Sequence, residues 1–583
     1  MTRSDPAPRT TAATPRIHGH LARLYGEALA DAWTPRLAER LAATERRFPG
    51  PPTPPAERLG PEASVLITYA DQVRAAGEAP LRTLKRLLDG PLAGTTEAVH
   101  LLPFYPSTSD DGFSVAAYDA VDPTVGTWDD VAALARDRRL MFDAVINHAS
   151  ASHPWFQSFL AGDPAFAGWF VTADLATDLS ATVRPRTTPL LTPFDAADGV
   201  RHVWSTFSAD QVDLDYRRPE VLAAVLDVLL GYVERGARLL RLDAVTYLWK
   251  APGTSCANLP QTHEVLKLVR TALEAATPGV VMVTETNVPH AQNVGYFGNG
   301  HDEAQMVYNF ALPPLALHAF ALGDARVLRD WATELRTPSP EATFFNFLAS
   351  HDGIGVRPVE GILPRAAIDA LAARVQGRGG RVSRKADVGG GESPYELNVS
   401  LFDALADPGR SEADGVRRML CAHALMLALP GVPGVYVHSL LGSRNDSVAL
   451  AATGRARSIN RGRFAWDELV AELADPRGRR RQVLDGLRHL LRTRAAHPAF
   501  HPAAPQRWPE APANVAAIVR STPTHDVVCL HHVGGPACSV DAARLLGRRW
   551  PMGARDLVRG EGVPDAHVAL AAHEVRWIEV PRT

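Results

Sequence analysis

Ionisable side chains end several short apolar runs of this chain, and their types suit acid, base and nucleophile chemistry. Asp243 follows Arg241 by two positions, so the guanidinium can hold that carboxylate ionised and oriented, as a nucleophile requires. Any one of these residues alone could be a solvated strand end, but the combination is hard to explain in that way. We therefore expect Asp243, Glu285 and Asp352 to meet in one site. The sequences at the ends of the runs are DAVINH (143–148), RLD (241–243), TETN (284–287) and HD (351–352).

Short apolar runs alternate with amphipathic stretches beyond residue 64, and these runs must position the acidic residues. Each run is too short for an independent helix, and segments of helical character lie between most of them. The alternation predicts parallel strands, and eight strands form a closed (β/α)8 barrel, whose active sites lie at the carboxyl ends of the strands. The predicted strands cover residues 64–69, 99–105, 140–147, 238–245, 280–286, 306–310, 344–350 and 432–438.

We expect three further units around the barrel, which itself covers 61–148 and 216–497. Residues 1–60 carry leucines at helical spacing before the helix-breaking run PGPPTPP, and they predict an N-terminal helical extension. Residues 149–215 follow the third strand without a clear period, and they predict an inserted subdomain. Short β-like runs in 498–583 predict a C-terminal antiparallel β domain. The predicted fold class is therefore α/β, a (β/α)8 TIM barrel with these three attachments.

The composition is that of an ordinary globular protein. Hydrophobic residues make up 46% and charged residues 21% of 583, and the net charge of −3 gives no reason to expect nucleic acid as a partner. We find no apolar run of about 18 residues for a membrane span and no secretory signal at the N-terminus. Four scattered cysteines predict reduced thiols and a cytoplasmic location. The oligomeric state stays open, with a homodimer as one alternative.

From about residue 64 to 500, the sequence resembles the α-amylase superfamily, glycoside hydrolase family 13. The four motifs that end the runs occur in the order of that family. The resemblance implies that Asp243 attacks the anomeric carbon, that Glu285 is the general acid/base and that Asp352 stabilises the transition state. It also implies that the sugar-binding subsite is completed by His148, Arg241 and His351.

Further motifs are similar to those of the sucrose phosphorylase branch of that superfamily. They include SDDGF (109–113), RPR (184–186), KAPGTSC (250–256), HDGIGVRP (351–358) and RSINR (457–461). In this branch, the Asp-x-Gly-Phe element and the first arginine of R-x-I-N-R grip the terminal glucose. The resemblance therefore implies glucose-binding roles for Asp110, Phe113 and Arg457. Tyr247, four residues after the implied nucleophile, matches an aromatic residue near the same subsite.

Enzymes of this branch transfer glucose to inorganic phosphate, which is a co-substrate and not a cofactor. Phosphate must reach the covalent intermediate before water does, so cations should gather on the acceptor side. Arg186 matches a loop arginine that this branch uses for phosphate or acceptor binding, although it could also be a solvated loop cation. Lys250 is a second candidate, with a structural ion-pair role as an equal alternative.

The aglycone is less clearly indicated. Enzymes that act on sucrose commonly carry His two residues after the acid/base, where this chain has Asn287. The surrounding TETNVPHAQNVGYFG, the N-terminal extension and GGGESPYELN (389–398) look more like the glucosylglycerate phosphorylases of the same branch. Sucrose phosphorylase, glucosylglycerol phosphorylase and an α-glucoside hydrolase or transglucosidase stay open as alternatives. A non-catalytic barrel is disfavoured because all three carboxylates are present.

The implied reaction is a retaining double displacement, which gives α-glucose 1-phosphate through a covalent β-glucosyl-enzyme. Such a reaction needs two carboxyl groups about 5–5.5 Å apart. Glu285 must be protonated at rest, so we expect burial and neighbouring carboxylates to raise its pKa. The mechanism requires no metal and no organic cofactor.

Overall fold

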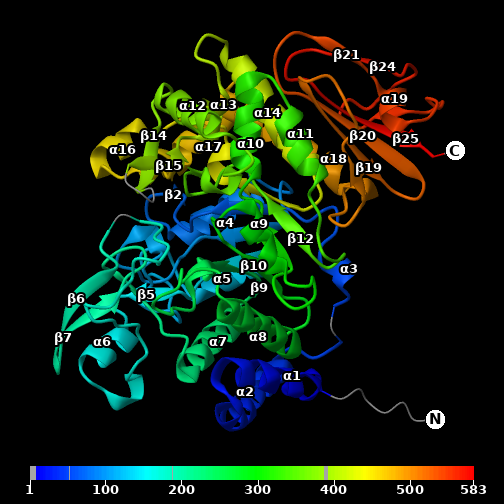
Figure 1. Cartoon of the computed structure of the whole chain (residues 1–583). Helices are drawn as coiled ribbons and strands as arrows, with labels where there is room; N and C mark the ends of the chain where they lie inside the picture. The colour runs from blue at the N-terminus through cyan, green and yellow to red at the C-terminus, as the bar shows by residue number, and fades with distance from the viewer. Residues whose placement is uncertain (1–7, 52, 187, 387–390, 583) are drawn as a thin grey trace, which may run out of the picture.

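The computed structural model describes residues 8–51, 53–186, 188–386 and 391–582. The first two glycines of GGGESPYELN lie outside these ranges. Eight parallel strands form a closed barrel at the centre of the molecule, and each of the eight predicted runs overlaps one of its strands (Figure 1). The barrel strands are β1 (Val65–Thr68), β3 (Ala98–Leu101), β4 (Arg139–Val145), β9 (Ala237–Asp243), β10 (Val281–Thr284), β11 (Met306–Tyr308), β12 (Thr343–Asn346) and β16 (Val432–Tyr436).

The register of the barrel brings the acidic strand ends to one level. Val145 of β4 lies opposite Asp243 of β9, and Leu242 lies opposite Thr284 of β10. Thr284 and Leu242 are the residues that precede Glu285 and Asp243. The two acidic residues therefore follow neighbouring strands at the same level of the barrel. Nearly every barrel residue is buried, as is typical of parallel strands covered by helices on the outside.

Helices α7 and α8 connect the strands that carry the acidic residues. Helix α7 (Pro219–Glu234) precedes β9, and helix α8 (Pro260–Ala276) separates β9 from β10. Both begin with proline, which suits the first turn of a helix because the missing N–H would be unpaired there. Their apolar residues pack on the barrel, and α14 (Glu412–Ala428) and α18 (Arg479–Ala495) cover another part of it.

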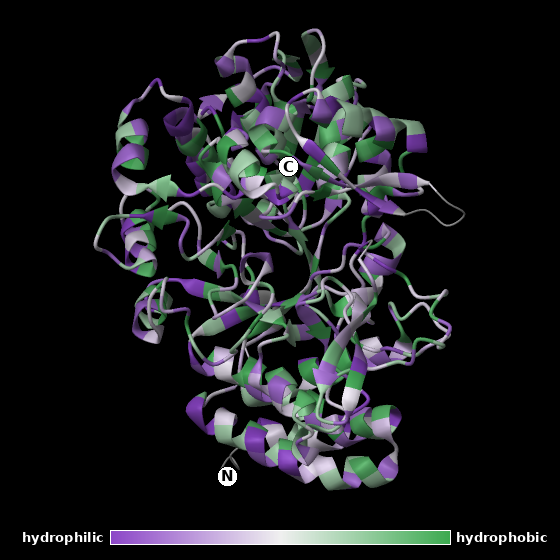
Figure 2. Cartoon of the chain, turned by 90° about the vertical axis from the view of Figure 1, so that its left-hand side faces the viewer, coloured by the Kyte–Doolittle hydropathy of each residue, from purple (hydrophilic) through white to green (hydrophobic). Residues whose placement is uncertain are grey.

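The N-terminal extension is a pair of helices beneath α7 and α8 (Figure 1). Helix α1 (Arg9–Tyr25) packs along α8, and helix α2 (Glu27–Arg47) contacts both α7 and α8. Gly26 joins the two helices with a φ of 84°, a backbone shape that favours glycine. Both helices carry mixed polar and apolar residues, as Figure 2 shows at the bottom of the view. Their buried residues include Ile17, Leu21 and Leu41.

Two excursions from the barrel lie next to the site. After β4 the chain forms strand β5 (His148–Ser150), helix α6 (Pro154–Leu160), a hairpin of β6 (Leu191–Ala196) with β7 (Gly199–Trp204), and strand β8 (Gln211–Asp213), which pairs with β5. After β12 a small antiparallel sheet has the order β13 (Ile354–Gly355), β15 (Glu392–Asn398), β14 (Arg381–Ala386). The inserted subdomain expected after the third strand is thus confirmed.

The C-terminal part is an antiparallel sheet at the upper right of Figure 1, as predicted. Its longest strands are β19 (Val515–Ser521), β20 (His525–His532) and β25 (Val575–Pro581). One of its faces has a separate apolar cluster, which distinguishes it from the barrel core. The fold class predicted from the sequence is therefore confirmed, whereas the exact domain boundaries stay predictions.

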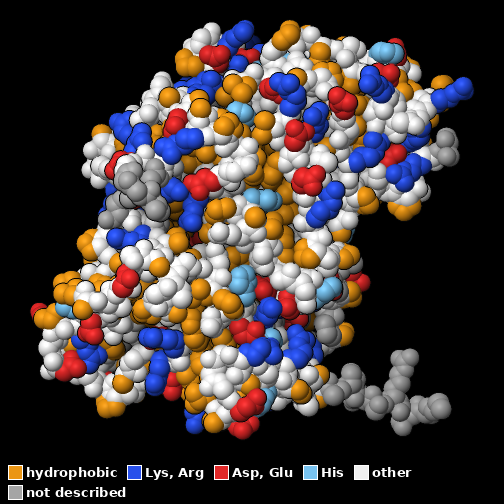
Figure 3. All heavy atoms as spheres, in the orientation of Figure 1, with side chains coloured by type: hydrophobic (Ala, Val, Ile, Leu, Met, Phe, Trp, Pro, Cys, Tyr) orange, Lys and Arg blue, Asp and Glu red, His pale blue; other side chains and the backbone are white. Residues whose placement is uncertain are grey.

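On the face shown in Figure 3, positive and negative side chains are intermixed rather than gathered by sign. Within the described residues, no helix has both the length and the apolar character that crossing a bilayer requires.

Candidate active site

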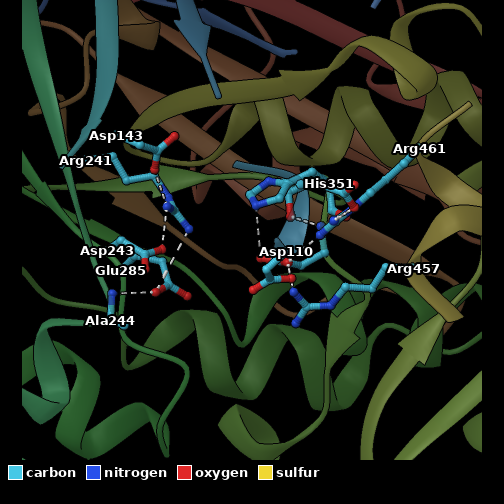
Figure 4. Close-up of polar contacts among 12 residues, drawn as sticks. Asp110, Asp143, Arg241, Asp243, Ala244, Glu285, His351, Arg457 and Arg461 are labelled. Carbon is cyan, nitrogen blue, oxygen red and sulfur yellow. Dashed lines mark hydrogen bonds and ion pairs between the residues drawn. The ribbon is translucent and has the colours of Figure 1, made fainter. Parts of the chain in front are cut away.

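A buried guanidinium group joins a carboxylate inside β4 to the carboxylate at the end of β9 (Figure 4). The Arg241 Nη1 atom donates to Oδ1 of Asp243 at 2.8 Å and also to Asp143. Asp143 accepts a second contact, at 2.7 Å, from Nε2 of His100. Burial alone would raise the pKa of Asp143, but Arg241 and His100 lower it below its usual value. Asp143 is therefore a fixed negative charge that orients Arg241.

Asp243 lies at the end of β9 with its carboxylate facing a cavity. Burial raises its pKa, and the contact with Arg241 opposes that effect because a nearby cation favours the ionised form. Since Arg241 contacts one carboxylate oxygen, the geometry orients the group as well as stabilising its charge.

Glu285 lies directly beside Asp243. The backbone N–H of Ala244 donates to Glu285 Oε2 at 3.0 Å, and Arg241 Nη2 lies 4.0 Å from the same oxygen. Ala244 has a φ of 51° and a ψ of 33°, the left-handed region that non-glycine residues rarely adopt. This turn aims the N–H at Glu285.

The Glu285 carboxyl is set for proton transfer near neutral pH. Burial, followed by the nearby charges of Asp243 and Asp352, raises its pKa to about 7 against the opposing effect of Arg241. A carboxyl with such a pKa can donate a proton in one step and accept one in the next.

Asp352 lines the same cavity within a second cluster of charges, of which Figure 4 labels His351, Arg457 and Arg461. Its Oδ1 atom contacts Arg457 Nη1 at 2.6 Å, and its Oδ2 atom lies 3.5 Å from His351 Nε2. Although burial alone would raise the pKa of Asp352, Arg457, His351 and Arg461 lower it well below its usual value. Asp352 is therefore ionised at every pH at which the protein would work.

Polar and aromatic groups form the floor of the cavity. The ring of Phe113 stacks on His351, with 5.0 Å between centroids and 2° between planes. His148 Nε2 lies 2.9 Å from the carbonyl oxygen of Phe113, and burial lowers the pKa of His351 well below its usual range. A neutral imidazole and a flat ring suit the hydroxyl groups and the apolar faces of a sugar.

The cavity opens at the carboxyl ends of the barrel strands and, together with its open mouth, encloses about 730 Å³. Arg241 does not line the cavity itself, but it binds Asp243, which does. The predicted residues that line it are Asp110, Phe113, His148, Arg186, Asp243, Tyr247, Glu285, Asn287, His351, Asp352 and Arg457.

Comparisons with known proteins identify this arrangement. Residues 94–354 match the alpha amylase catalytic domain. The chain is 51% identical to a glucosylglycerate phosphorylase of Allomeiothermus silvanus, over 84% of this chain and 87% of that protein. It is 41% identical to a glucosylglycerate phosphorylase of Escherichia coli, over 97% of this chain and all of that protein. The chain belongs to the glucosyl phosphorylase branch of the α-amylase family.

More distant relatives support the same placement of this glucosyl phosphorylase. A sucrose phosphorylase of Agrobacterium vitis is 34% identical over 75% of this chain and 88% of that protein. The crystal structure of a sucrose 6F-phosphate phosphorylase from Thermoanaerobacter thermosaccharolyticum superposes with a TM-score of 0.71 at 24% identity, over 88% of this chain and 98% of that one. At that identity the superposition supports the fold alone.

Lys250 does not line the cavity of this family member. Its ammonium group is buried, and it contacts Asp213 Oδ2 at 2.7 Å and Asn147 Oδ1 at 2.8 Å. A buried ammonium must be paired, and Asp213 is its partner. Of the two alternatives that the sequence left open, this geometry favours the structural ion pair over the acceptor-side role. Through its contact with Asn147, Lys250 connects the loop after β9 to the residue that precedes His148.

Several residues that line the cavity were not predicted from the sequence. Gln211 donates to Asp110 at 3.3 Å and to the Phe113 carbonyl at 3.1 Å. Glu396 binds Arg457 through two contacts of 2.8 and 3.1 Å. Both lie in the excursions, where no barrel periodicity marks a strand end. The motifs QVDLDY and SPYELN, which surround them, were the available signals.

Proposed function

We propose that this chain is a retaining phosphorylase that transfers glucose from a small α-glucoside, glucosylglycerate, to inorganic phosphate. The observation that carries the proposal is the joint placement of Asp243 and Glu285 around Arg241. One carboxylate is oriented by a cation, and the other has a pKa of about 7. The choice of aglycone is supported by the identities to glucosylglycerate phosphorylases, which exceed those to enzymes named for sucrose.

In the first half of the proposed reaction, a carboxylate oxygen of Asp243 attacks the anomeric carbon. The bond from that carbon to the glycerate oxygen breaks, and Glu285 gives this oxygen its proton. In the second half, a phosphate oxygen attacks the same carbon, the ester bond to Asp243 breaks, and Glu285 takes the proton of the phosphate. Two inversions retain the α configuration.

Asp352 and the residues around it would bind the glucosyl unit. We assign the sugar hydroxyls to Asp352, Arg457 and Asp110, and the apolar face of the sugar to Phe113. Arg241 would keep Asp243 ionised between turnovers, and His148 and His351 would complete the subsite. These roles follow from the family resemblance together with the positions of the residues around one cavity.

The proposal is tested by a screen of synthesis and phosphorolysis. Glucose 1-phosphate is supplied with glycerate, glycerol, fructose or fructose 6-phosphate as acceptor, and the release of phosphate is measured. We expect glycerate to give the highest kcat/KM. A higher value for fructose or glycerol would assign the enzyme to another aglycone, and glucose release at the same rate without phosphate would make it a hydrolase. A cytoplasmic location and a homodimer stay predictions.

A further inference from the structure

Two arginines beside the cavity differ from the other buried or half-buried cations of the site. Arg186 lies on the loop before β6 and lines the cavity, and Arg357 begins a short 3-10 helix after β13. Among the described residues, neither guanidinium has a carboxylate partner, whereas Arg241, Arg457 and Lys250 each bind at least one. Unpaired cations beside a cavity are a place where an anion can bind.

Each of the two arginines lies next to a tyrosine that lines the cavity. The Arg186 guanidinium lies 5.9 Å from the ring centroid of Tyr395. Val356, the neighbour of Arg357, donates its N–H to the Tyr395 carbonyl oxygen at 3.1 Å. Arg357 itself lies near enough to the hydroxyl group of Tyr247 to oppose the rise of its pKa on burial, and Tyr247 lines the cavity together with Tyr395. Two segments about 170 residues apart in the chain thus bring their cations to the same wall.

Tyr247, Asn287 and Glu285 line the same cavity, and Tyr247 lies near enough to Glu285 for its charge to raise the Tyr247 pKa, so we place this wall on the acceptor side. Tyr247 is four residues after Asp243, and Asn287 is two residues after Glu285. Asn287 packs on Gly355, where an added Cβ would lie 2.7 Å from Asn287 Nδ2. Its Oδ1 atom is buried and has no hydrogen-bond partner among the described residues. An unpaired buried oxygen can accept a hydrogen bond from a hydroxyl group of the acceptor.

We propose that Arg357, together with Arg186, forms an anion subsite that selects an aglycone with a carboxylate group and then binds phosphate in its place. The inference rests on the proposed function, and it adds Arg357 as a residue that determines specificity. While glucose is bound to Asp243, the aglycone leaves and phosphate enters from the same side. Both molecules are small oxyanions, and both fit the planar donor fork of a guanidinium group.

The test compares a charged acceptor with a neutral acceptor of nearly the same shape. We expect Arg357→Met to lower kcat/KM for glycerate in synthesis by about 10- to 100-fold, the size expected for loss of a charge-assisted hydrogen bond. The value for glycerol should change by less than about threefold, because glycerol has no charge to recognise. Arg357→Lys keeps the charge without the fork and should lie between the wild type and Arg357→Met.

The matched control is Arg384→Met, which removes an exposed arginine from β14 of the same excursion. It should leave both values unchanged. Equal losses for glycerate and glycerol in Arg357→Met, or no loss for either, would overturn the inference while leaving the proposed function intact. A wild-type enzyme that prefers glycerol or fructose would overturn the proposed function and the inference with it. If Arg357→Met does not fold, Arg357→Lys and Arg357→Gln give the same comparison.

Discussion

At the scale of single residues, a guanidinium group links the two carboxylates of the proposed reaction. Arg241 donates to Asp243 at 2.8 Å and lies 4.0 Å from Glu285. The same cation therefore acts on both pKa values, but it is closer to Asp243. The unequal distances keep the proposed nucleophile more strongly ionised than the proposed acid.

Replacing Glu285 with Gln should separate the two roles. We expect kcat/KM for glucosylglycerate to fall by about 10²- to 10⁴-fold, the usual contribution of a general acid. The value for α-glucosyl fluoride should fall by less than about tenfold, because fluoride leaves without a proton. Initial rates on both donors measure the difference. Asp243→Asn serves as the comparison, because it should lose activity on both donors. Equal losses for the two donors in Glu285→Gln would contradict the assignment.

The pH profile of kcat/KM for glucosylglycerate should be bell-shaped. Since Glu285 must be protonated to donate, the rate should fall as the pH rises through about 7, the pKa of Glu285. Since Asp243 must be ionised to attack, the rate should also fall as the pH drops through its raised pKa. Initial rates between about pH 4 and 9 measure both limbs. An alkaline limb that persists in Glu285→Gln would assign that limb to another group.

At the scale of elements, the loop after β9 depends on an ion pair that the sequence could not distinguish from a binding residue. Lys250 contacts Asp213 of β8, which lies opposite His148 of β5. This ion pair thus fixes the loop that carries Tyr247 to the inserted subdomain, and Lys250 is not free to bind an acceptor.

We expect Lys250→Met to destabilise the protein without changing its affinity for phosphate. Removing one partner of a buried ion pair typically costs about 3–5 kcal/mol, because the other charge stays buried. The free energy of unfolding in urea measures this loss. The KM for phosphate, measured at a temperature where the variant is folded, should stay within about twofold. A tenfold rise in that KM with normal stability would restore Lys250 to the acceptor side.

The N-terminal helix pair offers another test at this scale. Leu21 of α1 is 1% exposed, whereas Leu29 of α2 is 42% exposed. We expect Leu21→Ala to lower the stability by about 2–5 kcal/mol, the usual loss for a buried leucine. Leu29→Ala makes the same chemical change at the surface and should lower it by less than about 0.5 kcal/mol. Thermal unfolding of both variants measures the difference, and equal losses would show that α1 does not pack on α8 in solution.

The barrel could be predicted from the sequence because its eight strands are short, apolar and bounded by polar strand ends. The residues at those ends could be predicted for the same reason, since the carboxyl ends of parallel strands share one face. Gln211 and Glu396 could not, because they reach the cavity from excursions whose course is set by long-range contacts, and the position of Arg357 near Tyr247 depends on the same excursions. Lys250 was ambiguous because its partner, Asp213, is 37 positions away in the chain.

At the scale of the whole molecule, four cysteines are distributed over the loop after β9, a core helix and the C-terminal part. Cys256, Cys421 and Cys529 are buried, Cys538 is partly exposed, and all four are free. We expect a thiol reagent to modify at most Cys538 in the folded protein and all four cysteines after unfolding in guanidinium. Dithiothreitol should leave the Tm unchanged. A Tm that falls under reducing conditions would indicate a disulfide in the protein in solution.

The left-handed turn at Ala244 has a consequence for how this site can vary. Its contact with Glu285 is made by a peptide N–H, which every residue except proline supplies. What restricts position 244 is therefore the shape of the backbone: glycine, asparagine and aspartate enter that shape readily, and β-branched residues do not. A link between the two carboxylates of the proposed reaction is thus maintained by a backbone conformation, which a comparison of side chains alone would miss.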